Sequence, residues 1–328
     1  MPSLFPFAGA QNLAIGIAGV SASSFSCLMS NSIACLDCLE KSQWLPRYLY
    51  RPVDEAAKGS KATQTTKAKA TSQTDLFAGS DAGEFDASNG QSGEQVVVNG
   101  YIREDAIKPE AVIHFRAAYA GHESEIDADS VFYYIYGILH SKDYRETYAN
   151  NLKKELPRIP RVATFEEFKA FEEAGRKLAE LHVNYEQVQP YEGCTISGLE
   201  DGADADDLRV TKLKYGKIAG KKGNAKKGNA ALDKTKIVYN SKITISDIPL
   251  EVQDYVVNKK SALDWVVKRC GVSIDMVSQI VNDFNNMAEE MGDPQYILHL
   301  ILRVITVSLE TNKIVASLPA LHIHPLDQ

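Results

Sequence analysis

The sequence predicts an α+β fold in which a helical middle segment is followed by a mixed β unit and C-terminal helices. Three observations lead to this prediction. The middle third has long runs with apolar residues at helical spacing, β-rich runs stand on both sides of it, and polar stretches separate these elements. We expect two of the polar stretches to be disordered insertions, because they contain few large apolar side chains.

Composition indicates a folded protein. The 328 residues are 44% hydrophobic and 24% charged, which suffices for one large domain or two ordinary ones. A net charge of −7 means that any polyanionic partner must meet a local basic patch. The five cysteines form an odd and sparse set, typical of a reducing compartment, so we expect a cytoplasmic protein.

Neither of the two long apolar runs is predicted to enter a membrane. Residues 1–36 carry no charged side chain, but they lack a basic start, and polar residues and glycines interrupt the run. The run at 296–318 contains Arg303, Glu310 and Lys313. Charged groups at that spacing favour a buried helix with one polar edge.

The N-terminal third begins with an apolar strand at residues 13–17. No capping residue, turn signal or polar segment stands before this strand. Residues 54–95 are rich in Lys, Thr, Ala and Ser and then in Asp, Gly and Ser, so they are predicted to be a disordered or extended insertion. Order resumes at 95–104, a β-rich run that the turn signal at 99–100 divides into a hairpin.

The middle third is predicted to be helical. A proline-free run over 130–156 predicts one long helix, and the prolines in 156–162 predict an extended segment after it. Thr164 and Glu167 have the spacing of a capping box that opens the next helix. Residues 192–207 hold six acidic residues and are predicted to be a second loose region.

The last third combines strands and helices. Two β-rich runs, 208–215 and 234–245, flank a twofold repeat of KKGNA at 221–230, which predicts a long connection between strands. Helical segments are expected near 249–258, from Ser261, and after the Asp293-Pro294 pair. Between Lys212 and Lys236 there are nine lysines and one acid, a local reversal of the overall charge.

Five blocks of the sequence carry a resemblance to a known family, and they are residues 19–50, 132–162, 168–186, 234–269 and 293–319. In this order they strongly resemble the C-terminal specificity region of type ISP restriction–modification enzymes. The sequence departs from the family at 280–286, where a proline usually follows Asn-Asp, and at the lysine repeat, which looks like an expanded loop. The first departure concerns the turn near Phe284.

The resemblance implies a role in DNA recognition. Such enzymes are long polypeptides that carry a nuclease, a translocase motor, an N6-adenine methyltransferase and a target-recognition domain. This sequence has neither a G-x-x-x-x-G-K-[ST] phosphate loop nor an Asn/Asp-Pro-Pro-Tyr/Phe tetrapeptide. We therefore expect the target-recognition part alone, not an enzyme. Double-stranded DNA is the expected partner, and a separately encoded methyltransferase/translocase subunit is a further candidate.

The resemblance also suggests how the chain is organised. Its abrupt start fits a truncated or split reading frame. We expect the start of the recognition region, a disordered insertion, a helical part, an acidic loop, and a β unit with the lysine-rich loop and C-terminal helices. These segments are residues 1–53, 54–95, 96–191, 192–207 and 208–328.

The candidate DNA-binding residues are cations and polar side chains in two regions. Lysine on a glycine-rich tether suits phosphate neutralisation, whereas base reading requires rigid hydrogen-bonding groups on the β runs. An ordinary solvated loop and a wet helix face are the alternative interpretations. The candidates are Lys142, Arg145, Arg158, Arg161, Arg209, Lys212, Lys214, Lys217, Lys221, Lys222, Lys226, Lys227, Tyr239, Asn240 and Lys242.

No catalytic residue, metal or cofactor is expected. Cys35-x-x-Cys38 has the spacing of half a zinc site, with His322 and His324 as distant partners, but we favour buried thiols on a helix because structural zinc needs four convergent ligands. The alternative function is a truncated, non-functional remnant or protein-interaction fragment whose apolar face near 12–36 is exposed.

Overall fold

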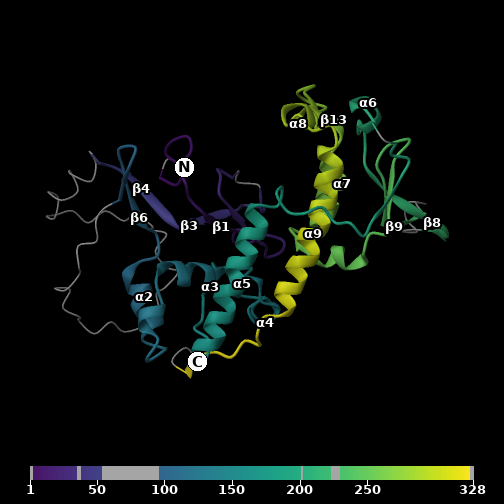
Figure 1. Cartoon of the computed structure of the whole chain (residues 1–328). Helices are drawn as coiled ribbons and strands as arrows, with labels where there is room; N and C mark the ends of the chain where they lie inside the picture. The colour runs from purple at the N-terminus through teal and green to yellow at the C-terminus, as the bar shows by residue number, and fades with distance from the viewer. Residues whose placement is uncertain (1–2, 35–37, 54–95, 201, 223–229, 326–328) are drawn as a thin grey trace. The chain divides into compact units, whose positions relative to one another are not determined.

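The computed structural model describes residues 3–34, 38–53, 96–200, 202–222 and 230–325. The predicted insertion at 54–95 therefore lies outside the described residues. The described residues have the α+β fold that the sequence predicts (Figure 1). Two compact units form the chain. Unit 1 comprises Met1–Val183 with Ser317–Gln328, and unit 2 comprises Asn184–Ala316.

Unit 1 begins with two three-stranded antiparallel sheets, ordered β2-β1-β3 and β4-β6-β5. The strands are β1 (Ala14–Ile17), β2 (Cys27–Ser30), β3 (Gln43–Pro46), β4 (Tyr48–Pro52), β5 (Val96–Val98) and β6 (Tyr101–Asp105). The predicted strand at 13–17 is confirmed as the buried central strand β1. The part of the apolar run that forms β1 is therefore buried, whereas Val20 and Ile33 of the run 12–36 are exposed.

The hairpin between β5 and β6 is also confirmed. Asn99 and Gly100 both have positive φ, 48° and 78°, which is the backbone conformation of a type I′ turn. Val97 pairs with Ile102 across this turn. Ile102 is buried, so the hairpin presents one face to the unit 1 core.

The helices of unit 1 follow the sheets. They are α2 (Pro109–Arg116), η2 (Glu123–Glu125), α3 (Ala128–His140), α4 (Lys142–Thr147) and α5 (Phe165–Val183). Figure 1 shows α3 and α5 side by side, and among the described elements these two helices make the most extensive contact. Thr164 and Glu167 make the predicted capping box, with bonds of 3.3 and 3.2 Å between each backbone N–H and the other side chain.

The single long helix predicted over 130–156 is wrong. Helix α3 ends at His140, because Ser141 has extended backbone angles (φ −60°, ψ 129°). The Ser141 hydroxyl accepts a hydrogen bond from the Tyr144 N–H and so starts α4. A serine can therefore divide a helix where no proline is present.

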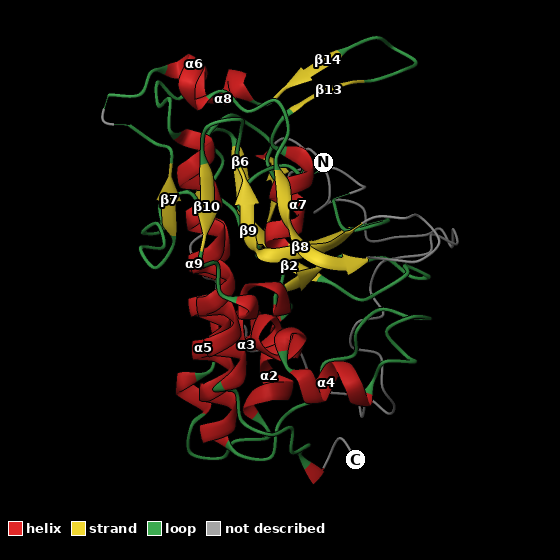
Figure 2. Cartoon of the chain, turned by 90° about the vertical axis from the view of Figure 1, so that its right-hand side faces the viewer, coloured by secondary structure: helices red, strands yellow, loops and turns green. Residues whose placement is uncertain are grey.

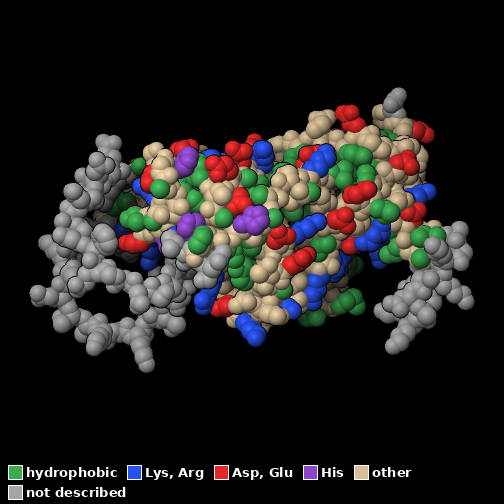
Figure 3. All heavy atoms as spheres, turned by 90° about the horizontal axis from the view of Figure 1, so that it is seen from below, with side chains coloured by type: hydrophobic (Ala, Val, Ile, Leu, Met, Phe, Trp, Pro, Cys, Tyr) green, Lys and Arg blue, Asp and Glu red, His purple; other side chains and the backbone are tan. Residues whose placement is uncertain are grey.

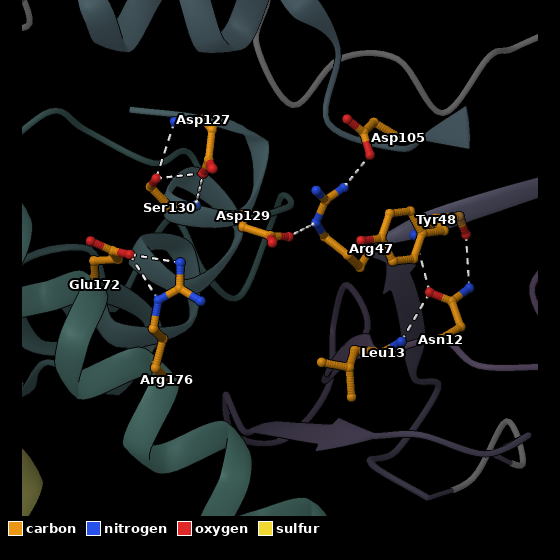
Figure 4. Close-up of polar contacts among 10 residues, drawn as sticks. All are labelled: Asn12, Leu13, Arg47, Tyr48, Asp105, Asp127, Asp129, Ser130, Glu172 and Arg176. Carbon is orange, nitrogen blue, oxygen red and sulfur yellow. Dashed lines mark hydrogen bonds and ion pairs between the residues drawn. The ribbon is translucent and has the colours of Figure 1, made fainter. Parts of the chain in front are cut away.

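A buried arginine joins the sheets of unit 1 to its helices (Figure 4). Arg47 lies between β3 and β4 and donates to Asp105 at 2.7 Å and to Asp129 at the start of α3. Burial would lower the pKa of Arg47, but the hydrogen bonds of the two carboxylates raise it above its ordinary value. Beside it, the Asn12 side chain bonds the backbone of Leu13 and Tyr48.

Unit 2 is built on a four-stranded antiparallel sheet of order β7-β10-β9-β8 (Figure 2). The strands are β7 (Thr195–Ser197), β8 (Lys214–Lys222), β9 (Ala230–Val238) and β10 (Thr244–Ser246). The KKGNA repeat lies between two paired strands, β8 and β9, as predicted, and residues 223–229 of that connection lie outside the described residues. The bounds differ from the prediction, since β8 begins only at Lys214 of the run 208–215, and the run 234–245 is divided between β9 and β10. Sheet residues such as Ile237 and Ile245 share a hydrophobic cluster with Ile301 and Ile305.

The other elements of unit 2 surround this cluster. They are α6 (Ala205–Leu208), η3 (Leu250–Asp254), β11 (Val256–Val257), β12 (Lys260–Ser261), α7 (Ala262–Arg269), β13 (Val272–Ile274), β14 (Val281–Asp283), α8 (Asn285–Glu290) and α9 (Tyr296–Ala316). The helices predicted from Ser261 and after Asp293-Pro294 are confirmed as α7 and α9. The hairpin of β13 and β14 projects away from the rest of unit 2 (Figure 2).

Two predicted segments of unit 2 differ from the structure. The acidic segment 192–207, predicted to be loose, contains the short strand β7 and the first three residues of α6, whose N-cap Asp204 accepts from the N–H groups of Asp206 and Asp207. The helix expected near 249–258 is reduced to the 3₁₀ turn η3. Asn258 and Lys259 have positive φ and reverse the chain between β11 and β12.

No helix in the described part of the chain combines the length and apolar character of a membrane span. The apolar run at 296–318 corresponds to α9, which is largely buried, as predicted.

Candidate functional site

An open pocket of about 550 Å³ lies on unit 2, between the end of α6, the segment that leads into β8, and the turn between β9 and β10. Five residues predicted from the sequence line it together. They are Arg209, Lys212, Lys214, Asn240 and Lys242. Because these residues come from two segments about thirty positions apart, their convergence is a property of the fold.

The segment 209–214 owes its orientation to alternating burial. Val210 and Leu213 are buried in the core, whereas Arg209, Lys212 and Lys214 are exposed. The backbone of Val210 is fixed at both polar groups, because its N–H donates to Asn285 Oδ1 and its carbonyl accepts from Asn285 Nδ2, both at 2.9 Å. The chain therefore presents its cations to the pocket.

The turn between β9 and β10 is held by Asn240. Its amide Nδ2 donates to the carbonyl oxygens of Asp207 and Arg209 at 2.7 and 3.3 Å, and its Oδ1 accepts from the N–H groups of Lys242 and Ile243 at 2.9 and 2.8 Å. The side chain thus ties the two walls of the pocket together. All four of its hydrogen-bonding positions are used inside the protein.

The pocket carries more positive than negative charge, with four cations and the carboxylates of Asp206 and Asp207 in its lining. Lys242 pairs with Asp207; this hydrogen bond and the attraction of opposite charges lower the pKa of Asp207 and raise that of Lys242, so both are ionised at neutral pH. Arg209 pairs with Asp283.

Two lysines of the pocket remain open to a ligand. Within the described ranges, Lys212 and Lys214 make no ion pair, and both are exposed. Lysines in this state can neutralise an anion that approaches from solvent without first breaking an internal ion pair.

The prediction that Tyr239 contacts DNA is wrong. It is fully buried in the unit 2 core, and its hydroxyl donates to the Leu208 carbonyl at 3.0 Å. Burial raises the pKa of the Tyr239 hydroxyl well above its ordinary value. Tyr239 directly follows β9 and is buried between the half-buried residues Val238 and Asn240.

The candidates in unit 1 do not form a comparable site. Arg161 is buried and donates to the His114 carbonyl at 3.0 Å, so its prediction as a DNA-gripping residue is wrong. Arg145 is half-buried and donates to the Leu139 carbonyl at 2.6 Å near the end of α3. Lys142 and Arg158 are exposed, and Arg158 pairs with Glu155 at 3.1 Å.

The lysine-rich connection is only partly described. Lys217 is exposed on β8. The backbone of Lys221 and Lys222 belongs to the same strand, and Lys226 and Lys227 lie outside the described residues. DNA contact by this connection stays a prediction.

The thiol prediction near the N-terminus is wrong for Cys38, which is exposed in a turn and not buried on a helix. Cys35 lies outside the described residues. His322 Nδ1 lies 2.6 Å from Glu167, and the His324 N–H donates to the Arg161 carbonyl. Across the described ranges, no group of three or more His, Cys, Asp or Glu residues is arranged to hold a metal ion.

Two residues that support the pocket, Asp283 and Asn285, are not predicted from the sequence. The single signal is the departure from the family pattern at 280–286. There β14 ends at Asp283, and Phe284 adopts helical angles before α8. Asp283 Oδ1 accepts from both the N–H and the side-chain amide of Asn285, so the local turn is well defined without a proline.

The sequence matches the family model of the Type ISP C-terminal specificity domain over residues 1–300, so the chain belongs to this family. This confirms the resemblance described above. Among curated proteins, none matches the chain.

Three similar solved structures are of larger proteins. One is a nuclease-deletion mutant of the Type ISP restriction-modification enzyme LlaGI in complex with a DNA substrate mimic, with 29% identity, a TM-score of 0.66, and coverage of 98% of this chain and 22% of that chain. The second is the ATP-dependent Type ISP restriction-modification enzyme LlaBIII bound to DNA, with 28% identity, a TM-score of 0.70, and coverage of 99% of this chain and 17% of that chain. The third is a DrdV–DNA complex, with 27% identity, a TM-score of 0.67, and coverage of 98% of this chain and 26% of that chain. This chain thus spans about a fifth of these proteins.

Proposed function

We propose that this chain is the target-recognition part of a Type ISP restriction–modification enzyme and that the unit 2 pocket binds double-stranded DNA at a specific sequence. The observation that carries the proposal is the convergence of Arg209, Lys212, Lys214 and Lys242 on one pocket. Membership of the specificity-domain family and three DNA-bound relatives support it.

The cations of the pocket divide the work of binding. Arg209 is held by Asp283, and a fixed guanidinium with free N–H groups suits bidentate bonding to the O6 and N7 atoms of guanine. Lys212 and Lys214 are exposed on flexible stems and suit phosphate oxygens. Asn240 holds the pocket walls in position and does not read a base.

The catalytic steps belong to other parts of the enzyme. We propose that the methyltransferase, translocase and nuclease are supplied by a separately encoded subunit and that the assembly acts in the cytoplasm. This chain then supplies sequence discrimination to that assembly. The family match supports the recognition role that this chain has in the proposal.

Selection from a pool of random duplexes tests the proposal. The chain is incubated with the pool at low and at moderate salt, bound duplexes are separated by gel shift, and the retained sequences are read. The proposal expects one short asymmetric sequence to be enriched at moderate salt. Retention of no duplex even at low salt would contradict it, as would retention without any sequence preference.

A further inference from the structure

A second group of cations on unit 2 surrounds a tryptophan. The Nζ atoms of Lys260 and Lys268 and the Cζ atom of Arg269 lie 4.7, 5.8 and 5.9 Å from the ring centroid of Trp265. We call these four residues the Trp265 cluster. None of them belongs to the pocket or to the residues predicted from the sequence.

The fold builds this cluster from two elements. Trp265, Lys268 and Arg269 lie on α7 at spacings of three and four residues, which places them on one face of the helix. Lys260 comes from β12, after the tight turn that joins it to β11. The Trp265 ring is fixed because its Nε1 donates to the Val257 carbonyl at 2.8 Å.

No carboxylate balances these charges. In the part of unit 2 that the structure describes, Lys260, Lys268 and Arg269 make no ion pair. The acid on α7, Asp264, is engaged by Lys234 at 3.0 Å and by the Tyr215 hydroxyl at 2.7 Å. Lys260 and Arg269 lower the pKa of Lys268, as expected for like charges held close together.

Helix capping accounts for only part of this arrangement. Lys268 and Arg269 stand in the last turn of α7, where cations interact favourably with the helix dipole. Lys260 belongs to another element, and its approach to the same ring adds repulsion between cations that the indole face offsets only in part. An anion bound among the three cations would relieve this repulsion.

The Trp265 cluster is connected to the pocket through the backbone. Gly271, two residues after Arg269, forms an antiparallel bridge with Lys212, and the Val272 N–H donates to the Thr211 carbonyl at 2.9 Å. The end of α7 therefore adjoins the segment that carries the pocket lysines. Cations on adjoining segments can bind the same polyanion at neighbouring positions.

We propose that the Trp265 cluster binds phosphodiester groups of the DNA backbone, beyond the base pairs that the pocket reads. This inference rests on the proposed function. Lys260, Lys268 and Arg269 each neutralise a phosphate, and Trp265 is a positioning residue that holds the cations in place. Contacts of this kind add affinity at every sequence and carry no sequence preference.

The salt dependence of duplex binding tests this proposal in the full chain. The variant Lys260→Gln/Lys268→Gln/Arg269→Gln is compared with a control that removes the same charge elsewhere, Lys108→Gln/Lys177→Gln/Lys313→Gln. The slope of log affinity against log salt is expected to become shallower by about 2 to 3 in the first variant, since each lost phosphate contact changes it by about 0.9. The selected sequence is expected to stay the same. Thermal melting confirms that both variants fold.

Substitution of the ring separates positioning from general stability. Trp265→Leu is expected to reduce the slope, whereas Trp265→Phe, which retains an aromatic face, is expected to restore most of it. An unchanged slope in the triple glutamine variant would overturn the inference while leaving the proposed function standing. Equal loss in the control variant would also overturn it. If the unmodified chain binds no duplex at all, the proposed function fails as well.

Discussion

Asn240 and Arg209 occupy the same pocket but differ in what they leave free for DNA. All four hydrogen-bonding positions of the Asn240 side chain are used by backbone groups of the two pocket walls. Arg209 pairs with Asp283, and its side chain is 45% exposed, so guanidinium N–H groups face solvent. At the scale of single residues, the pocket thus contains a structural amide, a fixed guanidinium and two exposed lysines.

Arg209 and Lys212 are predicted to have separable roles. Arg209→Gln should relax discrimination at one base pair by about 1–3 kcal/mol, because a bidentate contact is lost. Lys212→Gln should weaken binding to all duplexes alike and lower the salt slope by about 1. Affinities for single-base variants of the selected duplex, measured by fluorescence anisotropy at two salt concentrations, check both. Identical behaviour of the two variants would contradict this assignment.

Two buried histidines in unit 1 predict a loss of stability in acid. His140 and His182 are buried; burial and nearby Arg145 lower the pKa of His182 to about 3 and hold that of His140 well below its ordinary value. Because the unfolded chain binds protons below about pH 6.5 that the folded chain rejects, unfolding becomes easier as pH falls from 6.5 towards 3, by up to about 1.4 kcal/mol per pH unit and histidine.

Urea unfolding at pH 7 and pH 5 measures this effect. The free energy of unfolding of the parent chain should be lower at pH 5 than at pH 7. The decrease should be smaller in His182→Asn, because its unfolded chain lacks the His182 imidazole that takes up a proton. His322→Asn is the matched control, since His322 is exposed. The same pH dependence in parent and His182→Asn would rule out the explanation.

The packing of α3 against α5 shows what decides stability at the scale of elements. A Cβ atom on Gly175 would overlap the Tyr133 carbonyl oxygen, and one on Gly137 would overlap the Phe171 carbonyl oxygen. The two helix backbones therefore touch directly at two points. Glycine is required there for close approach, despite its cost of about 1 kcal/mol relative to alanine inside a helix.

Gly175→Ala is accordingly predicted to destabilise unit 1 by about 1–3 kcal/mol, because the overlap with a neighbouring backbone exceeds the gain in helix propensity. The urea midpoint of the variant, compared with that of Lys177→Ala on the exposed side of α5, measures the change. A higher midpoint for Gly175→Ala than for the parent would show that the helices can separate without cost.

Local signals in the sequence predict that an element exists better than they predict where it ends or which of its residues are buried. The Asn99-Gly100 turn, the Thr164–Glu167 capping box and a connection between paired strands at the lysine repeat are all predicted, because each depends on neighbouring residues. The break at Ser141 comes from a serine cap that the apolar pattern does not reveal, and the burial of Tyr239 depends on packing against distant parts of the chain. The sequence showed which cations are present, but their meeting at one pocket depends on Asn240 and Asn285.

For the whole molecule, charge distribution matters more than net charge. On the face shown in Figure 3, acidic and basic side chains are interspersed, in keeping with a chain of net charge −7. Two sites on unit 2, the pocket and the Trp265 cluster, nevertheless each bring several cations together. A polyanion is therefore expected to bind one limited surface of this protein.

Hydrogen–deuterium exchange with and without the selected duplex tests the central claim most directly, because it locates the bound surface. The account predicts slower exchange on duplex addition in residues 205–214 and 238–243, the two segments that line the pocket. Unchanged exchange in both segments while the duplex is bound, with protection confined to unit 1, would contradict it.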